Sequence, residues 1–288
     1  MWKNQFKTAV LLASLSAMLM FLGNLVGGTE GMTMAFLLSL IINGITYFFS
    51  DKIVLSMYRA KKLDPSRYQN IYAMVDELAK SMKIPMPKLW IIDTPMANAF
   101  ATGRNPSNAS VAVTSGILNI LDEDELRGVL AHELSHVINR DILVSTIAAT
   151  LASTIGYVAQ MMRFTAFYGP SDDTKDRVNP LGTLAAIVLM PIAASLVQLA
   201  ISRSREYLAD ETGADTTHEP LALASALEKL EQNKSFAHLN PNDMGKASTA
   251  SLFIVNPFLG GAIMNLFSTH PPMAQRIARL REMSRKRF

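Results

Sequence analysis

The sequence predicts a mainly α-helical membrane protein, in which four transmembrane helices carry an α+β domain with a small β-sheet. Three observations support this fold class: long uncharged stretches, a low charged fraction, and a polar block between two pairs of apolar stretches. Of the 288 residues, 49% are hydrophobic and 18% are charged, whereas a soluble domain usually carries about 25% charged residues. The chain is therefore expected to be embedded in a lipid bilayer.

Four apolar stretches are long enough to cross a membrane, because a spanning helix needs about 20 mostly apolar residues. They are Thr8 to Thr29, Gly31 to Ser50, Ile142 to Met162 and Val178 to Ser202. The first has no convincing cleavage site and is soon followed by the second, so we interpret it as a retained anchor. Prolines and glycines interrupt a fifth uncharged region, Ala247 to Gln275, which favours an internal core helix or an interfacial segment.

Basic residues predict the orientation of the chain. Lys3 and Lys7 precede the first apolar stretch, and further basic residues follow the second, whereas the connection between them carries only Glu30. By the positive-inside rule, the N-terminus and the central polar block lie in the cytoplasm. Arg203 and Arg205 close the fourth stretch on the same side.

These features divide the chain into four parts. Residues 1–50 form two N-terminal transmembrane helices, 51–141 a cytoplasmic block, 142–202 a second transmembrane pair, and 203–288 the C-terminal part of the same cytoplasmic domain.

Apolar periodicity and turn residues predict the elements of the cytoplasmic parts. The expected strands are Lys88 to Ile92 and Ala109 to Thr114. The expected helices are Pro65 to Met82, Asp122 to Asn139, Leu221 to Asn233 and Pro272 to Lys286.

The composition limits the chemistry that the chain can support. There is no cysteine, so disulfides, thiolate zinc sites and cysteine nucleophiles are excluded, and any metal must be bound by His, Asp or Glu. The formal net charge of +3 is small. No basic run interleaves with aromatic residues as in nucleic-acid binders, so nucleic acid is not an expected partner.

The strongest signal is the segment His-Glu-Leu-Ser-His from His132 to His136. Residues four apart lie on the same face of a helix, so both imidazoles can reach one Zn²⁺. Glu133 lies beside them and can accept a proton from water activated by the metal. The alternative is a helix surface with two satisfied histidines, which the helical context and a candidate third ligand disfavour. One Zn²⁺ per chain is the expected cofactor.

Two histidines leave a catalytic zinc site incomplete, because such sites usually have three protein ligands and a water. Glu206 supplies a carboxylate after the fourth apolar stretch, and Asp210 follows one helical turn later, where it can hydrogen-bond a ligand histidine. Alone, this pair would be interpreted as solvated acids beside Arg203 and Arg205. Two apolar stretches separate His136 from Glu206, so both residues return to the same side of the membrane and can bind one metal.

At these residues the sequence resembles the HtpX family of integral membrane metalloproteases, relatives of the type I CAAX prenyl proteases. The resemblance covers nearly the whole chain, from the N-terminal apolar pair to the late Ser-Thr-His-Pro-Pro segment. It implies a zincin-like catalytic domain in which Asp141 and Asp210 support the metal ligands. The positions that match the family's zinc ligands are His132, His136 and Glu206, and Glu133 matches its catalytic base.

The same resemblance singles out three more residues. Asn98 matches an asparagine that holds the substrate backbone, and His270 and Arg276 match residues implicated near the catalytic oxyanion. From the sequence alone, Asn98 is an ordinary turn residue and His270 a satisfied turn histidine. His218 and His238 match nothing and are expected at the surface.

Together the motifs predict a zinc metalloendopeptidase whose active site faces the cytoplasm. An extended substrate would pair with the edge of the strand Ala109 to Thr114. The resemblance implies quality control of misfolded membrane proteins, a stress-response role, in the bacterial inner membrane. Two alternatives stay open: a CAAX-type protease of prenylated proteins, which would have more spans, and a non-catalytic scaffold with a structural metal, which would not need Glu133.

Overall fold

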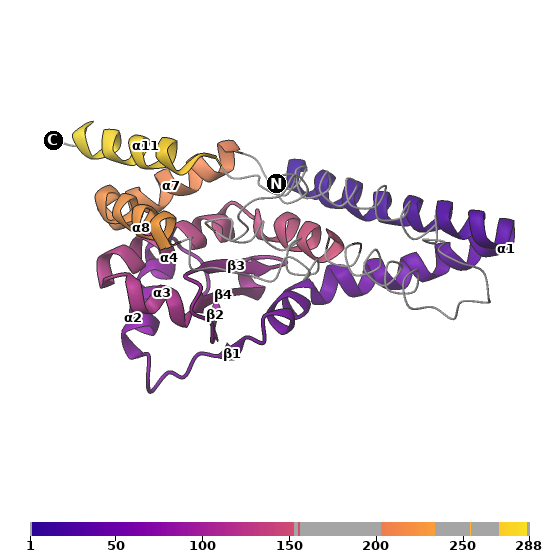
Figure 1. Cartoon of the computed structure of the whole chain (residues 1–288), viewed down its shortest axis with the longest axis horizontal. Coiled ribbons are helices and arrows are strands. Elements are labelled where there is room, and N and C mark those ends of the chain that lie inside the picture. Colours follow the sequence, from indigo (N-terminus) through magenta and orange to yellow (C-terminus); the bar gives the residue numbers. More distant parts are fainter. Residues whose placement is uncertain (1, 153–154, 156–202, 234–253, 255–270, 287–288) are drawn as a thin grey trace, which may run out of the picture.

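The computed structural model describes residues 2–152, 155, 203–233, 254 and 271–286. A long helical hairpin extends to one side of a block that contains a small β-sheet and the other helices (Figure 1). The described chain is mainly helical with a small mixed sheet, which confirms the expected fold class at this level. Residues 153–154, 156–202, 234–253 and 255–270 lie outside the described part. They include the end of the third apolar stretch, all of the fourth, His238, and most of the uncharged region Ala247 to Gln275.

The helical hairpin is α1, Trp2–Met57, whose two arms meet at Gly27 and Gly28. Gly28 has φ 58° and ψ −143°, a backbone conformation that residues with a Cβ rarely adopt. The arms lie side by side, since Asn43 donates to the carbonyl of Leu12 at 3.3 Å and to the hydroxyl of Ser16 at 2.9 Å. The connection is therefore at the glycine pair and not at Glu30, which belongs to the second arm.

The second arm, Gly27–Met57, is the one helix in the described part that is long and apolar enough to cross a membrane. Its 31 residues span about 46 Å at 1.5 Å per residue, more than the roughly 30 Å of a hydrocarbon core. The excess length reaches the sheet, where Val54 and Leu55 are buried against Ile92 and Phe100. Exposed apolar side chains cover the rest of the arm, among them Met34, Leu37, Leu40, Ile41 and Ile45.

Among the described residues, one of the four expected spans, the second, is long and apolar enough to cross a membrane. The total of four spans stays a prediction. The start of the third stretch, Ile142–Ala152, is a shorter apolar helix. It is buried in the block: Thr146 contacts the hydroxyl of Thr102 at 3.0 Å, and Ala149 packs with Phe100.

The sheet has the strand order β1-β2-β4-β3 within the described residues. Its strands are β1 Lys61–Lys62, β2 Lys88–Ile92, β3 Ala99–Gly103 and β4 Ala109–Thr114. The bounds of β2 and β4 are those expected. β4 pairs in parallel with β2 and antiparallel with β3, so the expectation that β4 is a free edge is wrong. Within the described residues the edge strands are β1 and β3. The sequence of β3, Ala-Phe-Ala-Thr-Gly, has no clear strand pattern.

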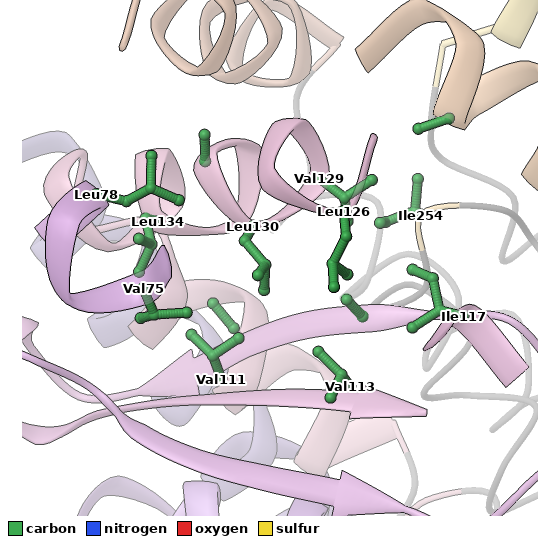
Figure 2. Close-up of a cluster of buried hydrophobic side chains, with 14 of the residues drawn as sticks. Val75, Leu78, Val111, Val113, Ile117, Leu126, Val129, Leu130, Leu134 and Ile254 are labelled. Carbon is green, nitrogen blue, oxygen red and sulfur yellow. The ribbon is translucent and has the colours of Figure 1, made fainter. Parts of the chain in front are cut away.

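Helices cover both sides of this sheet. The expected helices correspond to α2 Gln69–Ser81, α4 Glu123–Ile138, α8 Pro220–Asn233 and α11 Met273–Lys286, and the structure adds α3 Ser115–Ile120 and α7 Arg203–Thr217. Figure 2 shows Val111 and Val113 of β4 pointing towards Leu130 of α4 and Val75 of α2. Ala112, which lies between Val111 and Val113 in β4, points to the other side of the sheet, where it packs with Phe100.

The sequence determines where α4 begins. Asp122 accepts the backbone N–H of Glu125 at 2.9 Å, and Glu125 accepts the backbone N–H of Asp122 at 3.0 Å. This capping box satisfies two donors that a helix start leaves unpaired.

α7 approaches α4 closely at Gly213. A Cβ at this position would lie 2.9 Å from the backbone nitrogen of His132 and 3.2 Å from its Cα. Backbone atoms cannot move aside as a flexible side chain can, so this spacing between the helices requires glycine. It brings the first turns of α7 beside the histidines of α4.

We expect Gly213→Ala to destabilise the protein and weaken its metal binding. Overpacking a filled contact costs about 1–3 kcal/mol, and the higher helix propensity of Ala returns only about 1 kcal/mol. Thermal unfolding of the purified protein in detergent measures the loss. Gly44→Ala is the matched control, because a Cβ there meets no atom within 4 Å; equal unfolding temperatures for the two variants would contradict the packing argument.

Candidate metal centre

α4 places two imidazoles side by side in the interior of the block. His132 and His136 are one helical turn apart, with ring centroids 4.9 Å apart. Apolar residues surround most of the helix, and His132 is only 2% exposed. Together with Glu206, the two histidines form a cluster whose ligand atoms all lie within 4.8 Å of one another. This cluster could bind a metal ion.

Glu206, in the first turn of α7, faces both imidazoles. Its carboxylate oxygens lie 3.7 Å from His132 Nε2 and 3.6 Å from His136 Nε2. These separations are too long for hydrogen bonds. They are close to the edge of a tetrahedron with metal–ligand bonds of 2.0–2.1 Å, which is about 3.4 Å. The donor set of two imidazoles and a carboxylate thus fits a four-coordinate metal such as zinc.

Each histidine presents its other nitrogen to a separate carboxylate. His132 Nδ1 lies 2.9 Å from Asp210 Oδ1, and His136 Nδ1 lies 3.6 Å from Asp141 Oδ2. A carboxylate at Nδ1 favours the tautomer with the proton on that nitrogen and leaves Nε2 free to bind a metal. Asp210 is thus within hydrogen-bonding distance of its histidine, whereas Asp141 faces His136 at a separation longer than a hydrogen bond. The supporting role of both acids stays a prediction.

The end of α4 explains why Asp141 reaches back to His136. Arg140 adopts the left-handed conformation, with φ 56°. Its N–H donates to the carbonyl of Val137, and the N–H of Asp141 donates to the carbonyl of His136. This pair of bonds is the Schellman ending of a helix, and it turns the chain so that Asp141 lies beside the last turn.

The carboxylates give the cluster an excess of negative charge. Burial lowers the pKa of His136, but the carboxylates of Asp141, Glu206 and Glu133 outweigh burial and raise that pKa to about 9. An environment that favours a proton on an imidazole also favours a metal cation beside it.

Arg276 of α11 is fully buried behind His132. Its Nε and Nη2 donate to the two oxygens of Asp210 at 2.8 and 2.6 Å. Burial raises the pKa of Asp210, but Arg276 and His132 more than offset it and lower that pKa to about 2. Arg276 Nη1 lies 3.9 Å from a Glu206 oxygen. Its role at the oxyanion stays a prediction.

Glu133, the expected base, is buried between the histidines and β3. Its Oε2 accepts the backbone N–H of Ala101 at 2.9 Å. Burial raises the pKa of Glu133 above its ordinary value, although His132 and His136 lower it. A carboxylate with a raised pKa is a stronger proton acceptor than an exposed one.

Asn98 precedes β3 and is 1% exposed. Its Oδ1 accepts the backbone N–H of Ile254 at 3.1 Å, and its Nδ2 has no hydrogen-bond partner among the residues that the structure describes. His270 lies outside those residues. His218 directly follows α7, with φ 60°, and is exposed, which confirms its expected place at the surface.

Sequence reasoning missed three contacts at this cluster. They are the N–H of Ala101, the guanidinium of Arg205, which donates to Asp141 Oδ1 at 3.2 Å, and the amide of Asn4, which donates to the same oxygen at 2.9 Å. A backbone N–H has no side-chain signature. Asn4 and Arg205 lie in segments whose basic residues are already explained by the orientation of the chain in the membrane, so nothing in these segments indicated a contact with Asp141.

Comparison with known proteins gives consistent results. Residues 65–284 match the model of the family described as Peptidase family M48. A "Protease HtpX homolog" of Syntrophobacter fumaroxidans is 53% identical and covers 97% of this chain and 99% of its own. A "Protease HtpX homolog" of Pyrococcus abyssi is 49% identical, and the match covers 96% of this chain and 95% of the relative. The crystal structure of S. mikatae Ste24p has the same fold, with a TM-score of 0.50 at 19% identity; the match covers 96% of this chain and 65% of Ste24p.

We expect Arg276→Met to destabilise the protein by about 3–5 kcal/mol, because it leaves the buried Asp210 carboxylate without its guanidinium. Chemical unfolding of the purified protein measures this loss. Arg285→Met, at an exposed position of the same helix, should change stability by less than about 0.5 kcal/mol. A similar small effect at Arg276 would show that the buried pair is not needed for the packing of α11.

Proposed function

Because the chain belongs to peptidase family M48 and is a membrane metalloprotease, we propose that it is an endopeptidase with one catalytic zinc per chain. We assign His132, His136 and Glu206 as the ligands. The relatives named as proteases leave no reason to retain the scaffold alternative.

The orientation of the two imidazoles carries this proposal. Both turn Nε2 towards Glu206 and Nδ1 towards a carboxylate, Asp210 or Asp141. Histidines that merely fill a core would not need to present matching nitrogens to one point. His132, His136 and Glu206 would hold the zinc, which would supply a Lewis acid for the scissile carbonyl and would lower the pKa of a water molecule towards about 7.

We assign Glu133 as the general base. The N–H of Ala101 occupies Oε2, so Oε1 is the oxygen that takes the proton from the attacking water. The same carboxyl group then delivers this proton to the leaving amine. Its burial in the block keeps bulk water from competing for the proton.

We propose that an extended substrate binds along the start of β3. In an antiparallel pair, alternate residues direct their backbone groups away from the partner strand. Ala101 directs its N–H to Glu133 and away from β4, so Ala99, two residues earlier, also directs its backbone groups away from β4, where no strand pairs with it among the described residues. Backbone pairing there tolerates many substrate sequences, and the Nδ2 of Asn98 is an additional donor for the substrate backbone.

We propose that the substrates are misfolded membrane proteins. We also propose that the protein lies in the inner membrane of a bacterium, with its active site facing the cytoplasm. Lys52 lies over the ring of Phe49, and Arg104 over that of Phe48; such basic and aromatic groups are typical of a membrane interface. The catalytic block would then lie directly on the bilayer surface. The closeness of His136 and Glu206 requires an even number of crossings between them, which supports four spans in total.

One experiment tests the metal and the base together. The purified protein should contain about one zinc, and His132→Ala with His136→Ala should contain none. Glu133→Gln should keep its zinc, because the amide is nearly isosteric, but it should lose at least about 10²–10⁴-fold in peptidase rate, because it cannot accept the proton. Metal analysis and cleavage of an unfolded protein substrate measure the two effects.

His218→Ala is the matched control for loss of a histidine and should keep both zinc and activity. Full zinc content in the double-histidine variant would refute the ligand assignment. Near-normal turnover by Glu133→Gln would show that another residue activates the water.

Cysteine labelling tests the orientation, since the chain has no native cysteine. Ser81→Cys and Ser204→Cys, both exposed, should react with a membrane-impermeant thiol reagent only after the cells are opened. Thr29→Cys, beside the hairpin turn of α1, should react in intact cells. Labelling of Ser204→Cys in intact cells would instead place Glu206 on the far side of the membrane and refute the cytoplasmic assignment.

A further inference from the structure

Asn4, which precedes the first apolar stretch, lies against the end of the helix that carries both histidines. Its Nδ2 donates to Asp141 Oδ1 at 2.9 Å and to the carbonyl of Arg140 at 3.2 Å, with the carbonyl of Asn139 at 3.4 Å. One amide group thus contacts both the last carbonyls of α4 and the carboxylate that follows them. Asn4 and Asp141 are 137 positions apart in the sequence.

The two oxygens of Asp141 have different partners. Oδ1 accepts from Asn4 and from Arg205, whereas Oδ2 faces His136 Nδ1 at 3.6 Å and has no hydrogen-bond partner in the described part of the chain. The residue is only 3% exposed, so water cannot easily replace these donors. By fixing Oδ1, the two donors determine that Oδ2 is the oxygen presented to the imidazole.

We infer that Asn4 is a positioning residue of the metal site: it holds Asp141, and through Asp141 it sets the orientation and tautomer of His136. This inference rests on the proposed function, because it takes His136 to be a zinc ligand. The membrane hairpin would then contribute to the catalytic centre with a residue at its free end, in addition to anchoring the block.

The expected loss of zinc affinity depends on how many donors remain on Asp141 Oδ1 when Asn4 is removed. Loss of a group that orients a ligand histidine lowers metal affinity about 10–100-fold. Arg205 still binds Oδ1 when Asn4 is removed, so we expect about a tenfold weaker zinc affinity for Asn4→Ala. A residue that only tethers α1 to α4 would leave the zinc affinity unchanged.

A double-mutant cycle on the full-length protein in detergent tests this inference. The zinc affinities of wild type, Asn4→Ala, Asp141→Ala and the double variant are measured by competition with a chromogenic chelator. Asn4→Ala should bind zinc about tenfold more weakly, and it should have no further effect in the Asp141→Ala background. Gln5→Ala, an exposed neighbour on α1, is the control and should bind zinc as the wild type does.

Two results would overturn the inference: unchanged affinity in Asn4→Ala, or an equal loss with and without Asp141, since Asn4 would then act by another route. Asn4→Leu, which keeps a branched side chain but has no donor, gives the answer if Asn4→Ala does not fold. If the wild type itself binds no zinc, the proposed function fails. If the wild type binds zinc and the Asn4 variants bind it equally well, only this inference fails.

Discussion

The buried ion pair of Arg276 and Asp210 determines how three helices assemble. A guanidinium removed from water costs several kcal/mol unless a carboxylate compensates it, and Arg276 is completely buried. α11 can therefore dock only where Asp210 of α7 receives its guanidinium, and Asp210 is fixed in turn by Nδ1 of His132 on α4. The same electrostatic requirement that stabilises the packing also orients a candidate metal ligand.

Close backbone packing turns this charge network into a defined geometry. Gly213 lets α7 approach the backbone of His132, which brings Glu206 within reach of both imidazoles. On the opposite side of α4, small side chains on β3 let the helix approach the strand, so that the N–H of Ala101 reaches Glu133. The geometry of the candidate site thus depends on two close approaches, one between α7 and α4 and one between α4 and β3, that small residues make possible.

Much of this arrangement could be predicted from the sequence, because it is encoded in local patterns. The capping residues of α4, the period of α2, the limits of β2 and β4, and the spacing of His132 and His136 all have local signatures. β3 was missed because its residues, Ala-Phe-Ala-Thr-Gly, do not alternate between apolar and polar, and β4 was wrongly expected at the edge for that reason. Contacts such as Asn4 with Asp141 join distant segments, and no local pattern reports them.

The hydrogen bonds of the metal centre also constrain when the protein becomes active. Asn4 lies 137 positions before Asp141, and Arg276 lies 144 positions after His132, yet both contact the residues that surround the two histidines of α4. Contacts of such high sequence separation form late in folding. A chain synthesised only as far as α4 lacks Glu206, Asp210 and Arg276, so it holds its histidines in an incomplete electrostatic environment. The candidate metal centre can therefore be completed only after α7 and α11 have been synthesised and packed.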